Sequence, residues 1–434
     1  MATTYLTHTN SGTGSYQKST FSAWVKRSSL GTIQTMWNNQ VQAGVNQVRF
    51  EFDAADKIYI YGEEAGGYAL RALTTSVYRD LSAWYHVLVI IDTPQSAAAD
   101  RIKLYVNGVQ VTLTFSTTPA VNANLRMNYN STPVYVGSNA TASYFDGLMS
   151  HVHWIDGTAY PASTFGSVDA TSGIWSINTS PSVTYGTNGF FILKDGNTIT
   201  DSSSNSNNFS LGGGTLTKTE DCPANVFCVL NALDTTRGLS NGNTTYAGAS
   251  SGTVVKGTLG MSSGKYYAEC KVLSSAENMI GVLSMAQAPT TTFVGKSAVG
   301  WGMFGNGYIY NNASSSGSSG NSFSDNDIMG IALDMDNNKL YFSKNGVFLY
   351  SGDPTSGATG TGATSITSGL TMTFCGGRDN TSDTANFNFG NGYFGTTAVT
   401  TNSGNGYAGA EGASKFNYQP PTGYSALSTK GLNL

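Results

Sequence analysis

The sequence predicts an all-β protein that consists of two antiparallel β-sandwiches (jelly rolls) in tandem. Short runs in which apolar and polar residues alternate recur along the 434 residues, whereas the periodicity of amphipathic helices is nearly absent. Charged residues make up only 11% of the chain, against about 25% in average soluble proteins. Gly, Ser, Thr and Asn take their place, and this mixture is typical of many short strands joined by tight turns.

In the first half, several alternating runs are expected to form strands. They occupy residues 20–28, 48–53, 57–63, 84–92, 101–115, 133–138 and 148–157. Within the run 101–115, Asn107 and Gly108 separate two alternating segments. Both residues tolerate the positive φ of a two-residue type I′ turn, so this pair predicts a hairpin. Short strands at this spacing favour a sandwich over a doubly wound fold.

The second half repeats this arrangement without repeating the sequence. Its expected strands occupy residues 263–273, 298–312, 328–337, 338–350, 369–377 and 385–390. Asn345 and Gly346 again separate two alternating segments and predict a second hairpin. This half is therefore expected to form another antiparallel sandwich.

The stretch 199–235, which is polar and rich in glycine, is the best candidate for a domain boundary. It retains the apolar residues Phe209, Leu211 and Leu216, so we expect a packed connector rather than a free linker. The first sandwich would then comprise residues 1–198, and the second would comprise 236–434. Pro420 and Pro421 force an extended path on the C-terminal tail, which is expected to wrap the second sandwich.

Charge and hydropathy disfavour several classes of partner. The net charge is −4 and no run of Lys or Arg is present, which disfavours nucleic acids and acidic membranes. No apolar run approaches the length of about 20 residues that a membrane helix needs. The amino terminus lacks the basic start and the apolar core of a signal peptide. We therefore expect a soluble protein that is made in a cytoplasm, without membrane insertion.

The four cysteines do not form a recognisable framework. Cys222, Cys228, Cys270 and Cys375 are too few for a disulfide scaffold in a chain of this length, and no CxxC pair indicates zinc. We interpret them as reduced, mostly buried apolar residues.

Other potential metal ligands are also isolated in the sequence. Asp334, Asp336 and Asn338 begin like a calcium loop, but the closing Glu of such a loop is missing. His151 and His153 alternate on an expected strand, where two imidazoles bind a metal only if a third ligand joins them. No third ligand is identifiable, so we expect neither a metal site nor a cofactor.

The segment "EFDAADK" places Glu51, Asp53 and Asp56 within six positions. A glycosidase needs two carboxyl groups about 5–10 Å apart, and Glu51 and Asp53 would share one strand face, opposite Phe50 and Phe52. The alternative is a hairpin in solvent, because Asp and small Ala residues suit a turn between two aromatic strands. We favour the hairpin.

Larger segments resemble known families. Residues 20–27, 84–111 and 144–166 look like a concanavalin A-like, LamG-type lectin/glucanase domain, and the second half resembles a SPRY domain. His86 corresponds to a strand histidine of LamG domains and is expected to be structural. The joining segments, including "FNYQPPTGYSALSTKGL", resemble a two-part architecture of virion proteins from tailed bacteriophages. The resemblance covers nearly the whole chain and implies architecture more than molecular role.

The resemblance has consequences for individual carboxylates. Laminarinase-type enzymes of this superfamily carry Glu-x-Asp-x-(x)-Glu on one strand, facing the groove. Glu51 and Asp53 match the first two places, but Asp56 stands where Glu is expected. LamG relatives sometimes bind calcium at a rim, to which Asp92 or Asp146 could contribute, yet neither belongs to a convincing cluster.

The SPRY resemblance implies partner binding through loops at one end of the second sandwich, around residues 302–327. Sugars stack on aromatic faces while Asn side chains bind hydroxyl groups, so an aromatic loop rich in Asn suits glycan binding. The alternative is that these aromatic residues belong to the core. The predicted glycan- or partner-binding residues are Trp301, Phe304, Asn306, Tyr308, Tyr310, Asn311 and Asn312.

Together these observations favour a non-enzymatic structural and binding protein of a phage particle, either a tail-fibre component or a capsid decoration. It would be synthesised in the host bacterial cytoplasm and carried on the virion. Its expected partners are other virion proteins, a host cell-surface glycan, and copies of itself in a trimer or an array. The alternatives are a polysaccharide-degrading glycosidase on the first sandwich and a cellular adhesion or scaffold protein, which the missing secretion signal disfavours.

Overall fold

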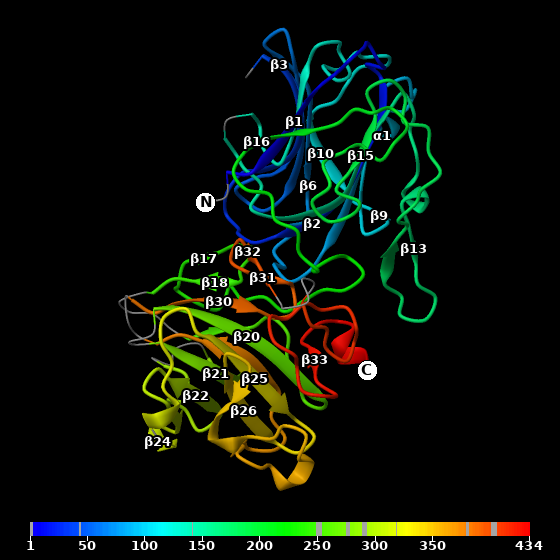
Figure 1. The fold of residues 1–434 in the computed structure, drawn as a ribbon. Coiled ribbons are helices and arrows are strands. Elements are labelled where there is room, and N and C mark those ends of the chain that lie inside the picture. The colour runs from blue at the N-terminus through cyan, green and yellow to red at the C-terminus, as the bar shows by residue number, and fades with distance from the viewer. Residues whose placement is uncertain are drawn as a thin grey trace. The chain divides into compact units, whose positions relative to one another are not determined.

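The computed structural model of the chain describes residues 3–42, 45–140, 142–248, 254–274, 278–288, 293–317, 319–378, 382–400 and 406–434. The chain divides into two compact units, Met1–Lys218 (the first unit) and Thr219–Leu434 (the second unit). Each unit contains two large sheets, whose strands are almost all antiparallel (Figure 1). The predicted fold class, two all-β sandwiches in tandem, is confirmed.

The first unit is built from an eight-stranded and a six-stranded sheet among its described residues. The eight-stranded sheet has the order β10 (Leu113–Thr117), β6 (Gly67–Thr74), β5 (Ile58–Glu64), β4 (Asn46–Phe52), β3 (Gln34–Gln42), β11 (Pro133–Val136), β1 (Tyr5–Thr9), β16 (Ser210–Gly213). The six-stranded sheet has the order β15 (Phe190–Ile192), β12 (Gly147–Asp156), β2 (Lys18–Arg27), β7 (Tyr85–Asp92), β8 (Ile102–Val106), β9 (Val109–Gln110). The hairpin of β13 (Gly166–Val168) and β14 (Trp175–Ile177), α1 (Ala98–Arg101) and η1 (Ala162–Thr164) complete the unit.

The core of the first unit lies between its two sheets. Alternate residues of the eight-stranded sheet, such as Phe50 and Ile60, pack against alternate residues of the six-stranded sheet, such as Phe21. Trp37 and Trp154 stack with ring centroids 4.1 Å apart. Because side chains alternate along a strand, the residues between these core positions lie on the faces that point away from the core.

The second unit has a nine-stranded and a six-stranded sheet in the part of the chain that the structure describes. The nine-stranded sheet runs β17 (Leu239–Ser240), β18 (Thr245–Tyr246), β30 (Thr384–Asn388), β20 (Lys265–Ser274), β25 (Ile328–Asp334), β26 (Lys339–Lys344), β27 (Val347–Phe348), with β28 (Thr364–Ser365) on β26 and β33 (Ser425–Ala426) on β20. The six-stranded sheet runs β19 (Val255–Lys256), β29 (Met372–Gly376), β21 (Met279–Ser284), β22 (Gly300–Phe304), β23 (Tyr308–Asn311), β24 (Ser314–Gly317). The remaining elements are β31 (Tyr393–Phe394), β32 (Thr397–Ala398), η2 (Ser319–Asn321), η3 (Leu349–Ser351), η4 (Gly357–Thr359) and η5 (Gly431–Asn433).

The C-terminal tail is attached to the central strand of the nine-stranded sheet. β33 pairs with β20 in parallel, and Glu269 of β20 accepts hydrogen bonds from the backbone N–H groups of Asn417 and Tyr418, each at 2.8 Å. Burial raises the pKa of Glu269 to about 7, although these two hydrogen bonds lower it. The tail is therefore anchored by a carboxyl group in the interior of the unit.

The division between the units falls within the stretch 199–235. Residues up to 218 belong to the first unit, where β16 pairs with β1. The following residues belong to the second unit, and Cys228 is part of its core. The connector therefore supplies structure to both units.

Both Asn-Gly hairpins are confirmed. Asn107 and Gly108 have φ values of 48° and 77°, and Asn345 and Gly346 have 48° and 83°. All four cysteines are free, and those other than Cys222 are buried. The prediction that the cysteines are mostly buried is therefore confirmed. Among the described residues, no helix is long and apolar enough to span a membrane.

Candidate functional site

Glu51 lies on β4 and is buried, with 2% of its surface exposed. Arg49 Nε lies 2.9 Å from Glu51 Oε2, and Thr35 Oγ1 donates to the same oxygen at 3.3 Å. Burial raises the pKa of Glu51, while the charge of Arg49 lowers it. The prediction that this carboxylate simply meets solvent is therefore wrong, because neighbouring side chains cover it.

Asp53 and Asp56 belong to the turn that follows β4 rather than to the strand. Asp53 Oδ1 accepts hydrogen bonds from the backbone N–H groups of Ala55 and Lys57, each at 2.9 Å. Asp56 has a φ of 66° and is 4% exposed. The hairpin prediction is confirmed, but Asp53 does not lie beside Glu51 on the strand, and Asp56 is not in solvent.

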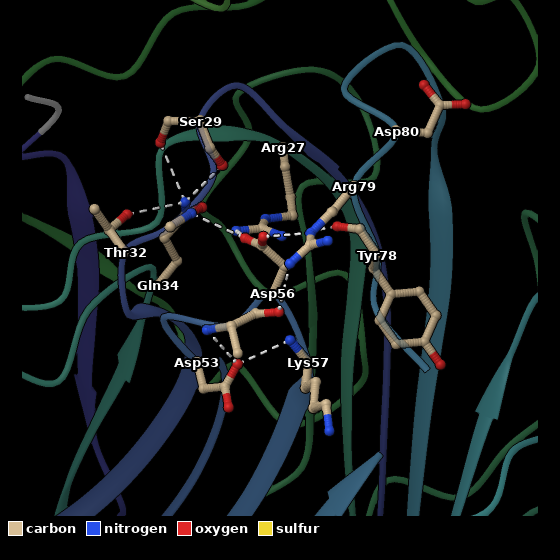
Figure 2. Close-up of polar contacts among 12 residues, drawn as sticks. Arg27, Ser29, Thr32, Gln34, Asp53, Asp56, Lys57, Tyr78, Arg79 and Asp80 are labelled. Atoms are coloured by element: carbon tan, nitrogen blue, oxygen red, sulfur yellow. Dashed lines mark hydrogen bonds and ion pairs between the residues drawn. The ribbon is translucent and has the colours of Figure 1, made fainter. Parts of the chain in front are cut away.

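Asp56 connects three segments at one end of the first unit (Figure 2). Its Oδ1 accepts hydrogen bonds from Arg27 Nη2 at 3.0 Å and from the backbone N–H of Gly31 at 2.9 Å. Its Oδ2 accepts one from Arg79 Nε at 2.9 Å. Burial opposes ionisation of Asp56, but these hydrogen bonds outweigh it and lower its pKa. This arrangement stabilises the loops and does not present a carboxylate to a substrate.

Arg27 is the buried partner of Asp56. Its side chain is completely buried, and its Nη1 donates to the backbone oxygen of Tyr78 at 2.8 Å. Its guanidinium carbon lies 4.4 Å from the centre of the Phe52 ring. The segment "EFDAADK" is therefore explained by an internal ion pair, whose partner is 29 residues away in sequence.

A second set of residues lies on the opposite side of β4, β5 and β6 from the core. Tyr61 of β5 is paired with Arg49 of β4 on one side and with Arg71 of β6 on the other. Tyr59 and Tyr68 are adjacent to this row, since the centroids of both rings lie 5.6 Å from that of Tyr61. We refer to these five residues, Arg49, Tyr59, Tyr61, Tyr68 and Arg71, as the tyrosine face.

The side chains of the tyrosine face hold one another in place. Arg71 Nε donates to the hydroxyl group of Tyr59 at 2.7 Å, and its guanidinium carbon lies 4.4 Å from the centre of the Tyr68 ring. The guanidinium carbon of Arg49 lies 4.8 Å from the centre of the Tyr61 ring. Each tyrosine is therefore positioned by an arginine in a preformed arrangement.

Exposure differs among these residues. Tyr68 is 50% exposed, whereas Tyr61 is 8% exposed. Glu63 is buried beside Tyr61, and its Oε2 accepts a hydrogen bond from Gln47 Nε2 at 2.9 Å. Burial and the neighbouring Glu63 raise the pKa of Tyr61. The face can offer ligands an aromatic ring, phenol groups and guanidinium N–H groups.

The sequence contains a signal for this face. Tyr59 and Tyr61 alternate with Ile58 and Ile60, so both tyrosines lie on the face opposite the isoleucines. Their approach to Arg71 depends on strand pairing, which the sequence pattern does not specify.

The seven residues predicted in the second unit do not form one surface. Trp301 is 4% exposed and belongs to the core, as the alternative interpretation expected. Asn311 Nδ2 donates to backbone oxygens of Gly300 at 2.9 Å and Ala298 at 3.2 Å, so its amide is used within the unit. Asn306 is exposed, and its Oδ1 accepts the backbone N–H of Tyr308 at 3.1 Å.

Phe304, Tyr308 and Tyr310 are half-buried, on the face of β22 and β23 away from the main core. Tyr310 lies between Phe304 and Phe293, with ring centroids 6.2 and 6.0 Å away, respectively. Asn312 is exposed in the turn that follows β23 and has a φ of 49°. Of the seven predicted residues, Trp301, Asn306, Asn311 and Asn312 are thus buried, turned inward by their contacts or part of a turn, whereas Phe304 and Tyr310 form an aromatic patch with Phe293. Residue 318 of the predicted loop region 302–327 lies outside the described residues.

The histidines are held by neighbouring side chains. Trp175 Nε1 donates to His86 Nδ1 at 3.1 Å, so His86 Nε2 carries the proton and donates to Ser22 Oγ at 2.8 Å. Burial lowers the pKa of His86 to about 3. His153 is buried and stacks on Phe191, with the two ring centroids 3.9 Å apart. These contacts indicate that His86 and His153 have structural roles.

The histidine pair and the calcium-like loop do not converge on a metal site. A bulge in β12 separates His151 from His153, and His151 has a φ of 49°. Asp334 is buried and binds Asn337 and Lys265. Asp336 accepts the backbone N–H of Gly264 at 2.7 Å. Within the described ranges, no group of three or more His, Cys, Asp or Glu side chains could hold a metal ion.

Comparisons with known proteins identify both domains. Residues 1–163 match the model of the concanavalin A-like lectin/glucanases superfamily, and residues 265–391 match the SPRY domain model. The chain therefore contains a LamG-like, concanavalin A-like domain followed by a SPRY domain. No curated protein matches the sequence significantly.

Three solved structures are similar to parts of the chain. The SPRY domain of human HERC1 is 15% identical, covering 36% of this chain and 96% of that one, with a TM-score of 0.29. The PSpry domain of TRIM65 is 14% identical, covering 37% and 91%, with a TM-score of 0.30. A putative carbohydrate binding protein from Bacteroides ovatus is 14% identical, covering 50% and 60%, with a TM-score of 0.34.

Proposed function

We propose that this protein is a non-catalytic binding protein of a bacteriophage particle, a tail-fibre component or capsid decoration, that attaches to a glycan of the host surface. The observation that carries the binding role is the tyrosine face, in which two arginines position three tyrosines. Sugar rings stack on exposed aromatic rings such as Tyr68, while phenol and guanidinium groups hydrogen-bond hydroxyl groups.

The positions of the carboxylates on this face support binding rather than hydrolysis. Glu63 is paired with Gln47, which precedes Glu51 by four residues on β4. At about 3.3 Å per residue, the strand positions of the two glutamates are about 13 Å apart. Glycosidase carboxyl groups lie about 5–9.5 Å apart. In addition, Oε2 of Glu51 is already occupied by Arg49 and Thr35.

The place on the particle rests on the resemblance of the joining and C-terminal segments to phage virion proteins. In this proposal, Phe304, Tyr308 and Tyr310 of the second unit contact other virion proteins or further copies of the chain. A single shallow site binds a sugar with a dissociation constant of about 1 mM, which corresponds to a binding free energy of about −4 kcal/mol. A trimer or an array of such sites raises the avidity by about 10²–10⁴-fold.

The binding role is tested by sedimenting the full-length protein with insoluble preparations of alginate, laminarin and host-cell envelope. The variant Tyr68→Ala should lose binding, because it removes the 50% exposed ring on which the sugar stacks in this proposal. Tyr105→Ala, on β8 of the other sheet, is the matched control and should bind like the unchanged protein. Binding that survives Tyr68→Ala, or release of reducing ends from any of these polysaccharides, would contradict the proposal.

The virion role has its own test. Antibodies raised against the full-length protein should decorate purified phage particles in electron micrographs, at several symmetry-related positions. Particles that remain unlabelled, while the same antibodies detect the protein in the infected-cell extract, would refute the virion role and leave the binding role to the sedimentation assay.

A further inference from the structure

We infer that the glycan bound on the tyrosine face is acidic, and that Arg71 pairs with its carboxylate or sulfate group. This inference rests on the proposed function, because it names the class of ligand for the same face. It depends on one guanidinium group that is held in place without an ionic partner.

The two arginines of the tyrosine face differ in their partners. Arg49 lies 2.9 Å from a carboxylate oxygen of Glu51, so its charge is compensated within the unit. Arg71 lies on β6, which β5 separates from β4, and it makes no ion pair within 4.0 Å to any residue that the structure describes. Within the part of the chain that the structure describes, its side chain makes one hydrogen bond, which it donates to the uncharged hydroxyl group of Tyr59.

The orientation of Arg71 is fixed by two tyrosines. Its Nε donates to the Tyr59 hydroxyl group at 2.7 Å, and its guanidinium carbon lies 4.4 Å from the centre of the Tyr68 ring. A guanidinium group has five N–H donors, so the four on the Nη atoms remain for a ligand. Two parallel N–H groups in a fixed plane match the two oxygens of a carboxylate or sulfate.

The carboxylates near Arg71 do not replace such a ligand. Glu63 and Glu51 are 8% and 2% exposed, and both are hydrogen-bonded by neighbouring side chains. Arg71 itself is half-buried beside the exposed Tyr68. The charge presented at the surface of this face is therefore that of a guanidinium group, next to a ring on which a sugar stacks. A uronate or a sulfated sugar supplies both contacts, whereas a neutral sugar supplies only the second.

The test measures binding of full-length protein to soluble oligosaccharides of alginate (a uronate), dextran sulfate (a sulfate) and laminarin (neutral) by calorimetry. We expect tighter binding to at least one acidic ligand than to laminarin, and weaker acidic binding at higher salt. Arg71→Gln should weaken acidic binding about 10- to 100-fold, as loss of charge-assisted hydrogen bonds does. Arg71→Lys keeps the charge but loses the fork, and should recover only part of the affinity.

Lys103→Gln removes one positive charge on β8 of the other sheet and is the matched control, which should leave binding unchanged. Melting temperatures of all variants show whether the fold is retained. If laminarin binds as tightly as the acidic ligands, and Tyr68→Ala weakens both while Arg71→Gln weakens neither, the inference is wrong and the proposed glycan binding stands. If no ligand binds and Tyr68→Ala changes nothing, the proposed binding role fails, and the inference fails with it.

Discussion

Replacing Asp56 by alanine should strongly destabilise the first unit. The change removes the carboxylate that compensates Arg27, whose side chain is completely buried. Removing one partner of a buried ion pair costs about 3–5 kcal/mol, because the other charge stays buried without compensation. The backbone N–H of Gly31 also loses its acceptor. With an m-value of about 2 kcal/mol/M in urea, the unfolding midpoint should fall by about 2 M.

Tryptophan fluorescence is a suitable assay, because of the 6 tryptophans all but Trp301 lie in the first unit. The control is Arg79→Ala, which removes the exposed partner of the same carboxylate and should cost less than about 1 kcal/mol. An Asp56→Ala midpoint equal to that of Arg79→Ala would refute the reasoning that Arg27 depends on this carboxylate.

The same pair has a pH dependence of known sign. The pKa of Asp56 is below its ordinary value of 3.8 in the folded protein. The stability that it contributes is therefore fully present above that value and is lost as the pH falls through the lowered pKa. Asp56→Asn should remove this part of the acid sensitivity of the tryptophan signal.

Three further predictions concern other sites. Burial raises the pKa of Glu269 to about 7, so the second unit should lose stability as the pH rises from about 4.5 to 7. Glu269→Gln should abolish this pH dependence, and it should lower the stability by about 1–3 kcal/mol because an amide N–H then faces a backbone N–H. If urea unfolding of Glu269→Gln shows the same pH dependence, Glu269 is not its source. Gly108→Ala should lower the melting temperature much more than Gly66→Ala does. Both glycines have a positive φ, but only at Gly108 would the added Cβ atom lie 2.4 Å from the Trp175 ring. Equal melting temperatures of the two variants would contradict this. Mass spectrometry without reductant should find four free thiols, and alkylation of the folded protein should spare the buried Cys270 and Cys375; a disulfide between Cys222 and Cys228 would overturn this.

The fold follows from local signals in the sequence. Asn107–Gly108 and Asn345–Gly346 predicted hairpins correctly, because the positive φ of both residues is a property of the turn itself. The alternation of apolar and polar residues along each strand is also a local property, so it predicts β-sandwiches without any knowledge of which strands pair. The domain boundary is less local, because β16 of the connector is stabilised by β1, about 200 residues earlier.

The candidate sites depend on pairing between distant segments. The small and polar neighbours of Asp56 predict that its side chain lies in solvent, yet it pairs with the buried Arg27. Trp301 and Phe304 are close in sequence, but they lie on opposite faces of β22, and only the packing of the second unit decides which face is core. Arg71 meets Tyr59 through the pairing of β6 with β5, and it meets Tyr68 of its own strand next to the register shift opposite Gly62 and Glu63. The sequence pattern contains the residues of the tyrosine face but not their contacts.

The central claim, that the first unit binds a glycan on its tyrosine face, is tested most directly by a crystal structure of the full-length protein with an acidic oligosaccharide. We expect a sugar ring stacked on Tyr68, with its carboxylate or sulfate oxygens within about 3 Å of the Nη atoms of Arg71. A sugar bound instead at Phe304 and Tyr310 of the second unit, with the tyrosine face unchanged, would contradict the account.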